Sequence, residues 1–332
     1  MEMHNLNKII YEAVNWNKSD LAMALFNQQN TQFWLESDVN VASDLPAWRT
    51  FEHKETYKKV LGGLTLLDTV QSNIGMNQIA LHTENLQEKS LYTQFAFFEA
   101  IHAKSYSRIF TTLCTNPEVD EIFEWVKENK ELQNKASIVS EYYDNITDDE
   151  SMFKAMFASV MLENVMFFSG FFYPLFLAGQ GLMKNSGEII NYIIRDEALH
   201  GVSVGLFAQR LFDTFDQGKQ DELKLWGYDL LLKIYENECR FTEDVYAETG
   251  LSSEVKKYIR YNANKAMMNL AWDIMFEEEE VNPIVLNGIN TQGSTMDFFS
   301  QKGLYTIAKV EPITDSTFNV LEKAKQKRLK FK

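Results

Sequence analysis

The chain contains 332 residues, of which 45% are hydrophobic and 24% are charged, a composition that excludes a disordered, collagen-like or disulfide-scaffold protein. Acidic residues outnumber basic ones by 47 to 32, and this excess of negative charge disfavours binding to nucleic acid. The two cysteines, Cys114 and Cys239, fit neither a disulfide framework nor a zinc motif, so we expect a reducing, cytoplasmic environment.

No segment of the sequence is expected to enter a membrane. The first ten residues lack the basic flank and the apolar core of a signal peptide. The most apolar stretch, residues 157–179, is long enough to span a bilayer, but it contains Glu163, Asn164 and Pro174. We therefore expect a buried core helix, in which Glu163 requires an ion-pair or metal partner.

Long helices are predicted for most of the chain. Between Pro46 and Pro283, only Pro117 and Pro174 interrupt a sequence rich in Leu, Met, Ala, Glu and Lys. The predicted helices cover residues 53–82, 86–113, 148–172, 188–215, 220–248 and 253–276. There is no internal repeat, linker or strand-type alternation, so we expect one all-α domain.

The segment after residue 276 differs in composition from the helical region. It begins with four glutamates at 277–280, contains turn-type residues and ends in the basic stretch KAKQKRLKFK. We expect an extended, partly mobile segment, and we assign the charge runs at 277–280 and 323–332 no chemistry. The domain boundary is placed at residue 290, which gives a helical domain of residues 1–290 and a flexible tail of residues 291–332.

Two Glu-x-x-His motifs lie on separate predicted helices: Glu99 with His102, and Glu197 with His200. The i, i+3 spacing places both side chains of a pair on one helix face, where they can bind one metal ion. A single copy is a weak signal in so acidic a chain, because an isolated pair more often belongs to a solvated face with surface ion pairs. Two copies are far more specific, since the chain has only five histidines.

Two further carboxylates, Asp68 in GGLTLLDTVQ and Glu163 in VMLENVMFF, lie in apolar surroundings where an unpaired charge is costly. Metal coordination would remove that cost. Carboxylates from four helices, two of which also carry a histidine, are typical of di-iron and di-manganese carboxylate bundles. The oxygen-rich ligand set with two imidazoles favours two Fe or Mn ions over Zn.

Tyr106 follows His102 by four residues and therefore projects from the same helix face one turn further on. A phenol beside the metal ions can be oxidised to a radical. It can equally fill core volume with its hydroxyl bonded to a ligand carboxylate, and the spacing alone does not decide between these roles.

Six motifs resemble the radical-generating (beta) subunit of class I ribonucleotide reductase, and most closely that of class Ib. They are, in family order, GGLTLLDTVQ, FFEAIHAKSYSRIFTTL, LENVMFFSGFF, IIRDEALHG, RYNANKAMMNL and VNPIVLNGI. The resemblance runs from about Trp16 to Phe318. It implies a ferritin-like helical bundle with additional helices and an extended C-terminal tail that docks to the large subunit.

The resemblance also implies which residues bind the metal ions. One ion would be bound by Asp68, Glu99 and His102, and the other by Glu163, Glu197 and His200, with glutamates bridging the two. All six positions are retained, which argues against the metal-free branch of the family.

A stored radical and a route for its transfer are implied as well. Tyr106 would carry the tyrosyl radical, and Trp34, Asp196 and Tyr305 would pass the oxidising equivalent toward the large subunit. Asp196 is placed to accept the ring N–H of metal-bound His102, as carboxylates commonly do for histidine ligands. Without the resemblance, Trp34 is better explained as an ordinary core residue.

The implied function is that of the small (beta) subunit of ribonucleoside-diphosphate reductase, which is inactive alone. The expected partners are a second copy of the chain, the large (alpha) subunit that reduces ribonucleotides to deoxyribonucleotides for DNA synthesis, and a flavodoxin-like activating protein. The sequence does not choose between Mn and Fe, between di- and triphosphate substrates, or between a bacterial and a viral source. The tail departs from the family pattern, because it has little acidity before Phe318 and then adds a basic extension of undetermined role.

Two other functions are open. A dinuclear iron oxygenase acting on a small substrate would use the same kind of centre, but it would leave Tyr106, Trp34, Asp196 and Tyr305 without a joint purpose. A ferritin-like storage protein needs neither a radical tyrosine nor a tail, and this chain is longer than a four-helix bundle requires.

Overall fold

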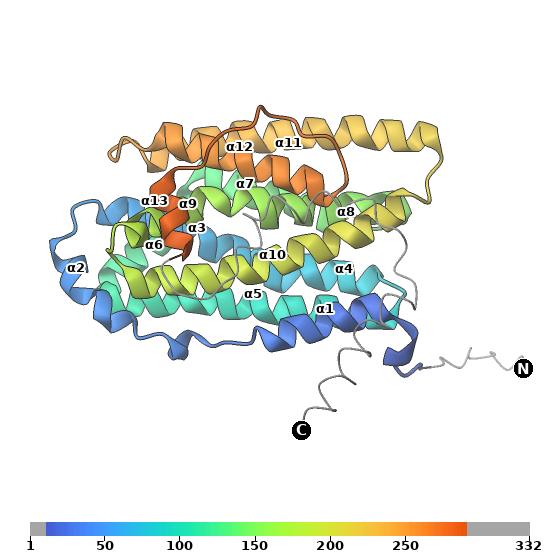
Figure 1. Cartoon of the computed structure of the whole chain (residues 1–332), viewed down its shortest axis with the longest axis horizontal. Helices are drawn as coiled ribbons and strands as arrows, with labels where there is room; N and C mark the ends of the chain where they lie inside the picture. Colours follow the sequence, from blue (N-terminus) through green and yellow to red (C-terminus); the bar gives the residue numbers. More distant parts are fainter. Residues whose placement is uncertain (1–10, 291–332) are drawn as a thin grey trace, which may run out of the picture. The chain divides into compact units, whose positions relative to one another are not determined.

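Residues 11–290, which the computed structural model describes, are largely helical, as the sequence predicts (Figure 1). The α-helices are, in chain order, α1 (Asp20–Thr31), α2 (Leu45–Thr50), α3 (Lys54–Val70), α4 (Met76–His82), α5 (Leu86–Leu113), α6 (Asn116–Glu128), α7 (Lys130–Tyr143), α8 (Asp149–Met161), α9 (Phe168–Gly179), α10 (Lys184–Phe212), α11 (Gln217–Val245), α12 (Ser252–Asn269) and α13 (Pro283–Asn290). The short 3-10 turns are η1 (Trp16–Lys18), η2 (Glu36–Asp38) and η3 (Val41–Asp44). The predicted tail, residues 291–332, lies outside the described residues.

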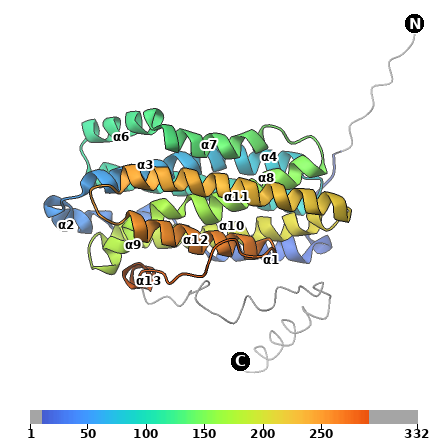
Figure 2. The same ribbon diagram turned by 90° about the horizontal axis from the view of Figure 1, so that it is seen from above.

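Four helical runs surround a common interior. α3 packs on α5, α5 on α10, α10 on α8 and α9, and α9 packs back on α3. Further helices cover this ring: α11 and α12 pack on each other, α12 also packs on α9 and α10, and α1 lies against α5 and α10 (Figures 1 and 2). The predicted helical bundle with additional helices is therefore confirmed.

Side-chain caps explain where α5 and α10 begin. The Asn85 side chain accepts hydrogen bonds from the backbone N–H groups of Gln87 and Glu88 in the first turn of α5. The carboxylate of Asp44 accepts hydrogen bonds from the backbone N–H groups of Asn185 and Ser186 in the first turn of α10. Because Asp44 belongs to η3, its carboxylate also ties the N-terminal segment to α10.

Two π-helical segments interrupt the α-helical hydrogen-bond pattern. They are η4 (Gln71–Gly75), between α3 and α4, and η5 (Leu162–Met166), between α8 and α9. Asp68 lies three residues before η4, and Glu163 lies within η5. Single π-helical turns inside α-helices occur frequently at functional sites, so both segments direct attention to the interior that they face.

The run formed by α8, η5 and α9 contains the most apolar stretch of the chain. It is long and apolar enough to span a membrane, but its most apolar window is 100% buried inside the bundle. The prediction of a buried core helix is confirmed. The helix continues past Pro174 to Gly179, beyond the predicted end at residue 172, because the buried apolar side chains on both sides outweigh the one backbone hydrogen bond lost at proline.

Other predicted boundaries need correction. Residues 53–82 form α3, η4 and α4 rather than one α-helix, and the sequence did not predict α6 or α7. The predicted helix 253–276 ends early, as α12, at Asn269. Ala271 then takes a left-handed φ of 56°, and the Asn264 side chain accepts hydrogen bonds from the backbone of Met275 and Phe276. The chain thus reverses where the periodicity suggested continuation.

The expectation of an extended segment after residue 276 is wrong for residues 283–290, which form α13. Pro283 is its first residue, a position where proline loses no helical hydrogen bond. A Cβ on Gly288 would clash with the backbone of Leu175 in α9, and a Cβ on Gly179 would clash with the backbone of Ile284. The two glycines therefore allow direct backbone contact between α9 and α13, which no local sequence pattern reveals.

The acidic run at 277–280 is likewise more than a solvated segment. Arg260 of α12 donates hydrogen bonds to both carboxylate oxygens of Glu279, at 2.6 and 2.8 Å. The same guanidinium donates to the hydroxyl of Tyr235 in α11. This bidentate pair fixes the connection between α12 and α13 to the surface of the bundle.

Candidate metal centre

The six predicted ligands meet in the interior of the four-run ring. They are Asp68 in α3, Glu99 and His102 in α5, Glu163 in η5, and Glu197 and His200 in α10. Each side chain is at most 1% exposed. Their ligand atoms form two sets, and within each set the atoms lie within 4.8 Å of one another. The first set is Asp68, Glu99, His102 and Glu197, and the second is Glu99, Glu163, Glu197 and His200.

Glu99 and Glu197 belong to both sets, and each presents one oxygen to each histidine. Glu99 Oε2 lies 3.4 Å from Nδ1 of His102, and its Oε1 lies 2.8 Å from Nδ1 of His200. Glu197 Oε1 lies 2.8 Å from Nδ1 of His102, and its Oε2 lies 3.3 Å from Nδ1 of His200. Two carboxylates that each contact both imidazoles in this way could be shared by a pair of ions.

Several atoms of the predicted ligands are buried without a hydrogen bond. Such atoms need another partner, and a metal ion can provide it. Both oxygens of Asp68, both oxygens of Glu197 and Glu163 Oε2 make no hydrogen bond. His102 Nδ1 and Glu197 Oε1 are close but are not aligned for a hydrogen bond. Buried carboxylates need a compensating cation, and carboxylate oxygen with imidazole nitrogen suits Fe or Mn. The residues therefore fit a pair of such ions.

Burial and mutual repulsion shift the pKa values of the carboxyl groups in the cluster. Burial and the charge of Glu99 raise the pKa of Asp68 well above its usual range, and the same causes raise the pKa of Glu163 to about 7. Burial and the charge of Glu99 also raise the pKa of Glu197 well above its usual range. Burial acts the same way on Glu99, but the contacts of its two oxygens with His102 and His200 prevail and lower its pKa to about 2. The site thus holds more carboxyl groups than can ionise together without a cation.

Tyr106 lies on α5, one turn after His102, and its side chain is 0% exposed. Its hydroxyl makes no hydrogen bond. Burial and the charge of the neighbouring Asp68 raise the pKa of the phenol well above its usual value. The phenol is therefore kept neutral and shielded from water beside a ligand, where the i, i+4 spacing predicts it.

Trp34 reaches the centre from the segment between α1 and η2. Its indole Nε1 donates a 2.7 Å hydrogen bond to Asp196 Oδ2, and the same oxygen lies 3.2 Å from His102 Nε2. The Trp34 and His102 rings are stacked with centroids 6.1 Å apart. The structure thus brings together Trp34, Asp196 and His102, as predicted, whereas Tyr305 lies outside the described residues.

Sequence reasoning missed three buried polar side chains that contact Glu163 directly or through one another: Gln71, Ser159 and Tyr143. The Gln71 amide donates to Glu163 Oε1 and to Ser159 Oγ, and it accepts from the Tyr143 hydroxyl. A signal was present, because Gln71 is a polar residue three positions after Asp68 on the same helix face. Its partners come from α8 and α7, and no spacing in the sequence joins them to it.

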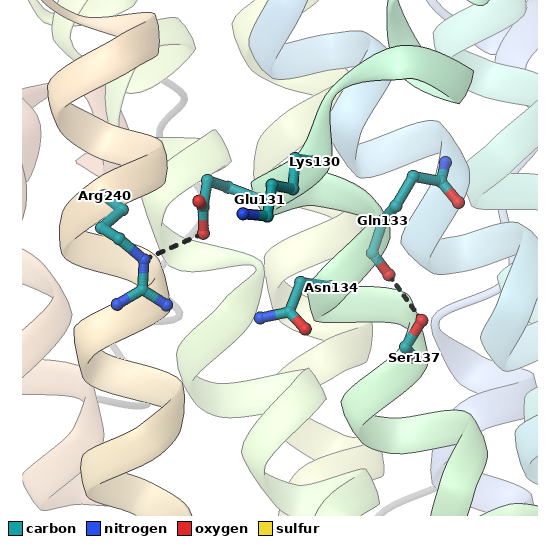
Figure 3. Close-up of a pocket in the computed structure, with 6 residues that line it drawn as sticks. All are labelled: Lys130, Glu131, Gln133, Asn134, Ser137 and Arg240. Atoms are coloured by element: carbon teal, nitrogen blue, oxygen red, sulfur yellow. Dashed lines mark hydrogen bonds and ion pairs between the residues drawn. The ribbon is translucent and has the colours of Figure 1, made fainter.

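A hollow on the surface between α7 and α11 lies apart from these residues (Figure 3). It is lined by Lys130, Glu131, Gln133, Asn134, Ser137 and Arg240. Arg240 Nε donates to Glu131 Oε2 across it at 3.0 Å. None of the predicted site residues lines it, so the candidate site is the buried interior and not this hollow.

Known proteins match almost the whole chain. The family model described as "Ribonucleotide reductase, small chain" matches residues 13–283. The ribonucleoside-diphosphate reductase subunit beta of Bacillus subtilis (strain 168) is 51% identical over 317 residues, which cover 93% of this chain and 96% of that protein. The subunit beta of Bacillus phage SPbeta is 51% identical over 322 residues, which cover 95% and 98%.

A solved structure agrees with the sequence match. The crystal structure of dimanganese(II)-NrdF from Streptococcus sanguinis is similar with a TM-score of 0.81 and 44% sequence identity, covering 84% of this chain and 100% of that one. The resemblance inferred from the six sequence motifs is confirmed. Sequence, fold and the buried carboxylate and histidine cluster agree, and the chain belongs to the ribonucleotide reductase small-chain family.

Proposed function

We propose that this chain is the radical-generating small (beta) subunit of a class Ib ribonucleoside-diphosphate reductase. It binds two Mn or Fe ions, stores one oxidising equivalent on Tyr106 and lends it to a large subunit that reduces ribonucleotides. The observation that carries the proposal is the double bridge of Glu99 and Glu197 between two buried histidines, with Tyr106 one turn away. The dimanganese(II) state of the Streptococcus sanguinis relative supports Mn as one working metal.

Two groups of residues would hold the ions. They are Asp68, Glu99 and His102 for one ion, and Glu163, Glu197 and His200 for the other, with Glu99 and Glu197 shared. A dinuclear Mn or Fe centre held by these residues, once oxidised by an oxygen-derived oxidant, would be able to remove one electron from a phenol.

Tyr106 contributes the redox-active ring. A phenol that loses an electron becomes strongly acidic, so its hydroxyl proton leaves with the electron. Asp68 is the carboxylate beside the ring, and as an ionised metal ligand it would be the nearest group of this chain that could accept that proton. The complete burial of Tyr106 excludes water and reductants from the ring, which lengthens the lifetime of a radical stored there.

Trp34, Asp196 and Tyr305 would transfer the oxidising equivalent to the large subunit. The hydrogen bond from Trp34 to Asp196, and the contact of that carboxylate with His102, support a continuous path from the centre to the indole. Trp34 is 4% exposed, but the flanking Phe33 and Leu35 are 53% and 37% exposed, so the path ends close to the surface. For residues 291–332 we propose a tail that docks to the large subunit and carries Tyr305.

A homodimer and a flavodoxin-like activator are proposed as further partners in the cytoplasm. An apolar surface patch supports the homodimer: Phe33 and Phe97 are 53% and 54% exposed, and both rings contact Phe98 edge-on. An exposed aromatic patch of this kind is typical of a protein interface. The activator would supply an oxygen-derived oxidant to the Mn form, whereas the Fe form would assemble with dioxygen.

The proposal is tested by loading the purified protein with Fe(II) and oxygen, and separately with Mn(II) and a reduced flavodoxin-like activator. Metal content is counted and the electron paramagnetic resonance (EPR) spectrum is recorded for the wild type and for Tyr106→Phe. We expect about two ions per chain in both proteins, and a tyrosyl signal only in the wild type. A signal that survives in Tyr106→Phe would refute the role of this residue. Two ions without any radical would favour the dinuclear oxygenase instead.

Transfer is tested separately with Tyr305→Phe. This variant is expected to keep the stored radical and to lose ribonucleotide reduction in the presence of the large subunit. Loss of the radical itself would contradict a role restricted to transfer.

A further inference from the structure

The amide of Gln71 is hydrogen-bonded on all sides in the interior of the bundle. Its Nε2 donates to Glu163 Oε1 at 2.5 Å and to Ser159 Oγ at 2.9 Å, and its Oε1 accepts from the Tyr143 hydroxyl at 2.8 Å. Gln71 and Tyr143 are both 0% exposed. Three elements thus converge on one ligand: η4 carries Gln71, α7 carries Tyr143 and η5 carries Glu163.

The hydrogen-bond partners fix which way the amide points. An ionised carboxylate can only accept, so the side of the amide that faces Glu163 must be the NH₂ group. The hydroxyl of Tyr143 donates to the carbonyl side, and a rotation of the amide by 180° would set its oxygen against the carboxylate. The carboxylate of Glu163 thus selects this orientation, and Tyr143 satisfies the amide oxygen in it.

The backbone of η4 leaves space for this arrangement. A Cβ added to Gly75 would overlap with Gln71 Oε1 and with the ring of Tyr143. Glycine at this position, one π-helical turn after Gln71, lets the phenol ring approach the amide.

The contact with Gln71 makes the two oxygens of Glu163 different from each other. Oε1 is taken by the amide, whereas Oε2 makes no hydrogen bond and lies 3.9 Å from Nδ1 of His200. Asp68, on the opposite side of the cluster, has no amide donor, and the Tyr106 hydroxyl beside it is not in good hydrogen-bond geometry with either oxygen. The two halves of the centre are therefore supported differently: Asp196 contacts His102 in one half, and Gln71 contacts Glu163 in the other.

We propose that Gln71, anchored by Tyr143, is a positioning residue that holds Glu163 with Oε1 directed away from the metal ion and Oε2 free to bind it. The inference rests on the proposed function, because it requires that Glu163 ligate a metal ion. It predicts that loss of the Gln71 or Tyr143 hydrogen bond weakens metal binding in the half of the centre that contains Glu163 and His200, and leaves the half that contains Asp68 intact.

The test compares Gln71→Met and Tyr143→Phe with the wild type and with Tyr57→Phe. Tyr57 is a matched control, because it is a 1% exposed tyrosine that lies eleven residues before Asp68 on α3, roughly 16 Å away. Mn(II) is titrated into the metal-free proteins, free Mn(II) is counted by EPR, and the spectrum of the bound pair is recorded. Crystal structures of the Mn(II)-loaded proteins report how Glu163 binds. Thermal unfolding of the metal-free proteins monitors the fold.

In Gln71→Met we expect the Mn(II) site that contains Glu163 to lose about 10- to 100-fold in affinity, the usual effect of losing a hydrogen bond behind a ligand. In Tyr143→Phe we expect a loss of about fivefold, as for one neutral hydrogen bond. Both variants should change the EPR spectrum of the bound pair and place both Glu163 oxygens within reach of the ion, and Tyr57→Phe should do neither.

Three outcomes would overturn the inference. They are unchanged affinity and spectrum in both variants, an equal loss at both Mn(II) sites, and a Tyr143→Phe protein that cannot be distinguished from Tyr57→Phe. A wild type that binds neither Mn(II) nor Fe(II) would instead refute the proposed function, and the inference with it. Because Tyr143→Phe removes one hydroxyl and keeps the ring, it provides the test even if Gln71→Met does not fold.

Discussion

Lys135 Nζ lies 2.7 Å from Glu238 Oε1, and both side chains are at most 2% exposed. The ammonium group also donates to Ser169 Oγ at 3.0 Å and lies 3.6 Å from the centroid of the Phe241 ring. This ion pair joins α7 to α11 and has no contact with the predicted ligands. It is the kind of buried pair whose desolvation offsets most of its attraction.

Breaking this pair on one side is expected to destabilise the protein strongly. Glu238→Leu leaves the Lys135 ammonium buried without its counter-ion and should lower the free energy of unfolding by about 3–5 kcal/mol. The double variant Lys135→Met/Glu238→Leu removes both charges and should be as stable as the wild type or more stable. Urea unfolding of Glu238→Leu, Lys135→Met and the double variant measures the coupling energy between the two residues. Changes in the free energy of unfolding that simply add would show that the two charges are not coupled.

The pH dependence of the same pair follows from its pKa shifts. Burial raises the pKa of Glu238 above 4.5, so its contribution to stability is present below pH 4.5 and is lost as the pH rises through the folded-state pKa. Burial lowers the pKa of Lys135 below 10.5, so its contribution is present above pH 10.5 and is lost as the pH falls through the folded-state pKa. The double variant should therefore gain most relative to the wild type near neutral pH. Urea unfolding of both proteins at several pH values measures this difference. A gain in stability of the double variant that is largest in acid would contradict the predicted pH dependence.

Replacing the indole at the end of the proposed path should separate radical storage from radical transfer. Trp34→Phe removes the N–H that donates to Asp196 but leaves all six ligands and Tyr106 in place. The variant should bind metal and show the tyrosyl EPR signal at wild-type intensity, while ribonucleotide reduction with the large subunit falls to background. Trp48→Phe is a matched control, because this tryptophan is 5% exposed and packs on Phe51 and Tyr57. Equal activity of the two variants would exclude Trp34 from the path.

Metal removal is expected to lower thermal stability. The centre concentrates four buried carboxylates around two histidines, and bound ions would compensate their charges. Two independent sites, each at a free metal concentration a hundred times its Kd, add about 5 kcal/mol to the free energy of unfolding. Calorimetry of the Mn(II)-loaded and the chelator-treated protein measures the difference. Asp68→Ala should reduce the response to metal, and an identical response in this variant would remove Asp68 from the ligand set.

The proposed homodimer is tested at Phe97, the residue of the aromatic patch that lies on α5. Phe97→Lys places a charge in the exposed patch and should weaken association by about 2–4 kcal/mol, the effect of a central interface residue. Leu225→Lys on α11 is a matched control, since Leu225 is 70% exposed and lies outside the patch. Sedimentation of both variants gives the oligomeric state. If Phe97→Lys remains dimeric, the patch is not the interface.

The sequence predicted elements and ligands whose signals are local. α5 begins and ends as predicted at Leu86–Leu113, because an asparagine cap precedes a long run of helix formers. Four of the six proposed ligands were predicted because each histidine follows its glutamate on one helix face, and Asp68 and Glu163 because they lie in apolar surroundings. The Trp34 to Asp196 hydrogen bond spans 162 positions, and only the family resemblance suggested it.

What the sequence could not predict depends on contacts between distant segments. α13 was missed because its stability comes from the backbone contact of Gly179 and Gly288, and not from its own periodicity. Gln71 was missed because its partners lie in α7 and α8. The π-helical segments were missed because a change of hydrogen-bond register leaves no mark in hydrophobic spacing.

The π-helical segment around Glu163 makes the centre sensitive to deletions as well as to substitutions. Each residue of an α-helix advances the chain by about 100° around the helix axis. A π-helical turn holds about one residue more than an α-helical turn, so deleting one residue from Leu162–Met166 would restore a regular α-helix and leave α8 and α9 close to their present orientation. Only the side chains inside the segment would be redistributed around the helix axis, which would turn Glu163 away from its partners. A relative that retains all six proposed ligands but lacks the extra residue would then be unable to assemble the pair.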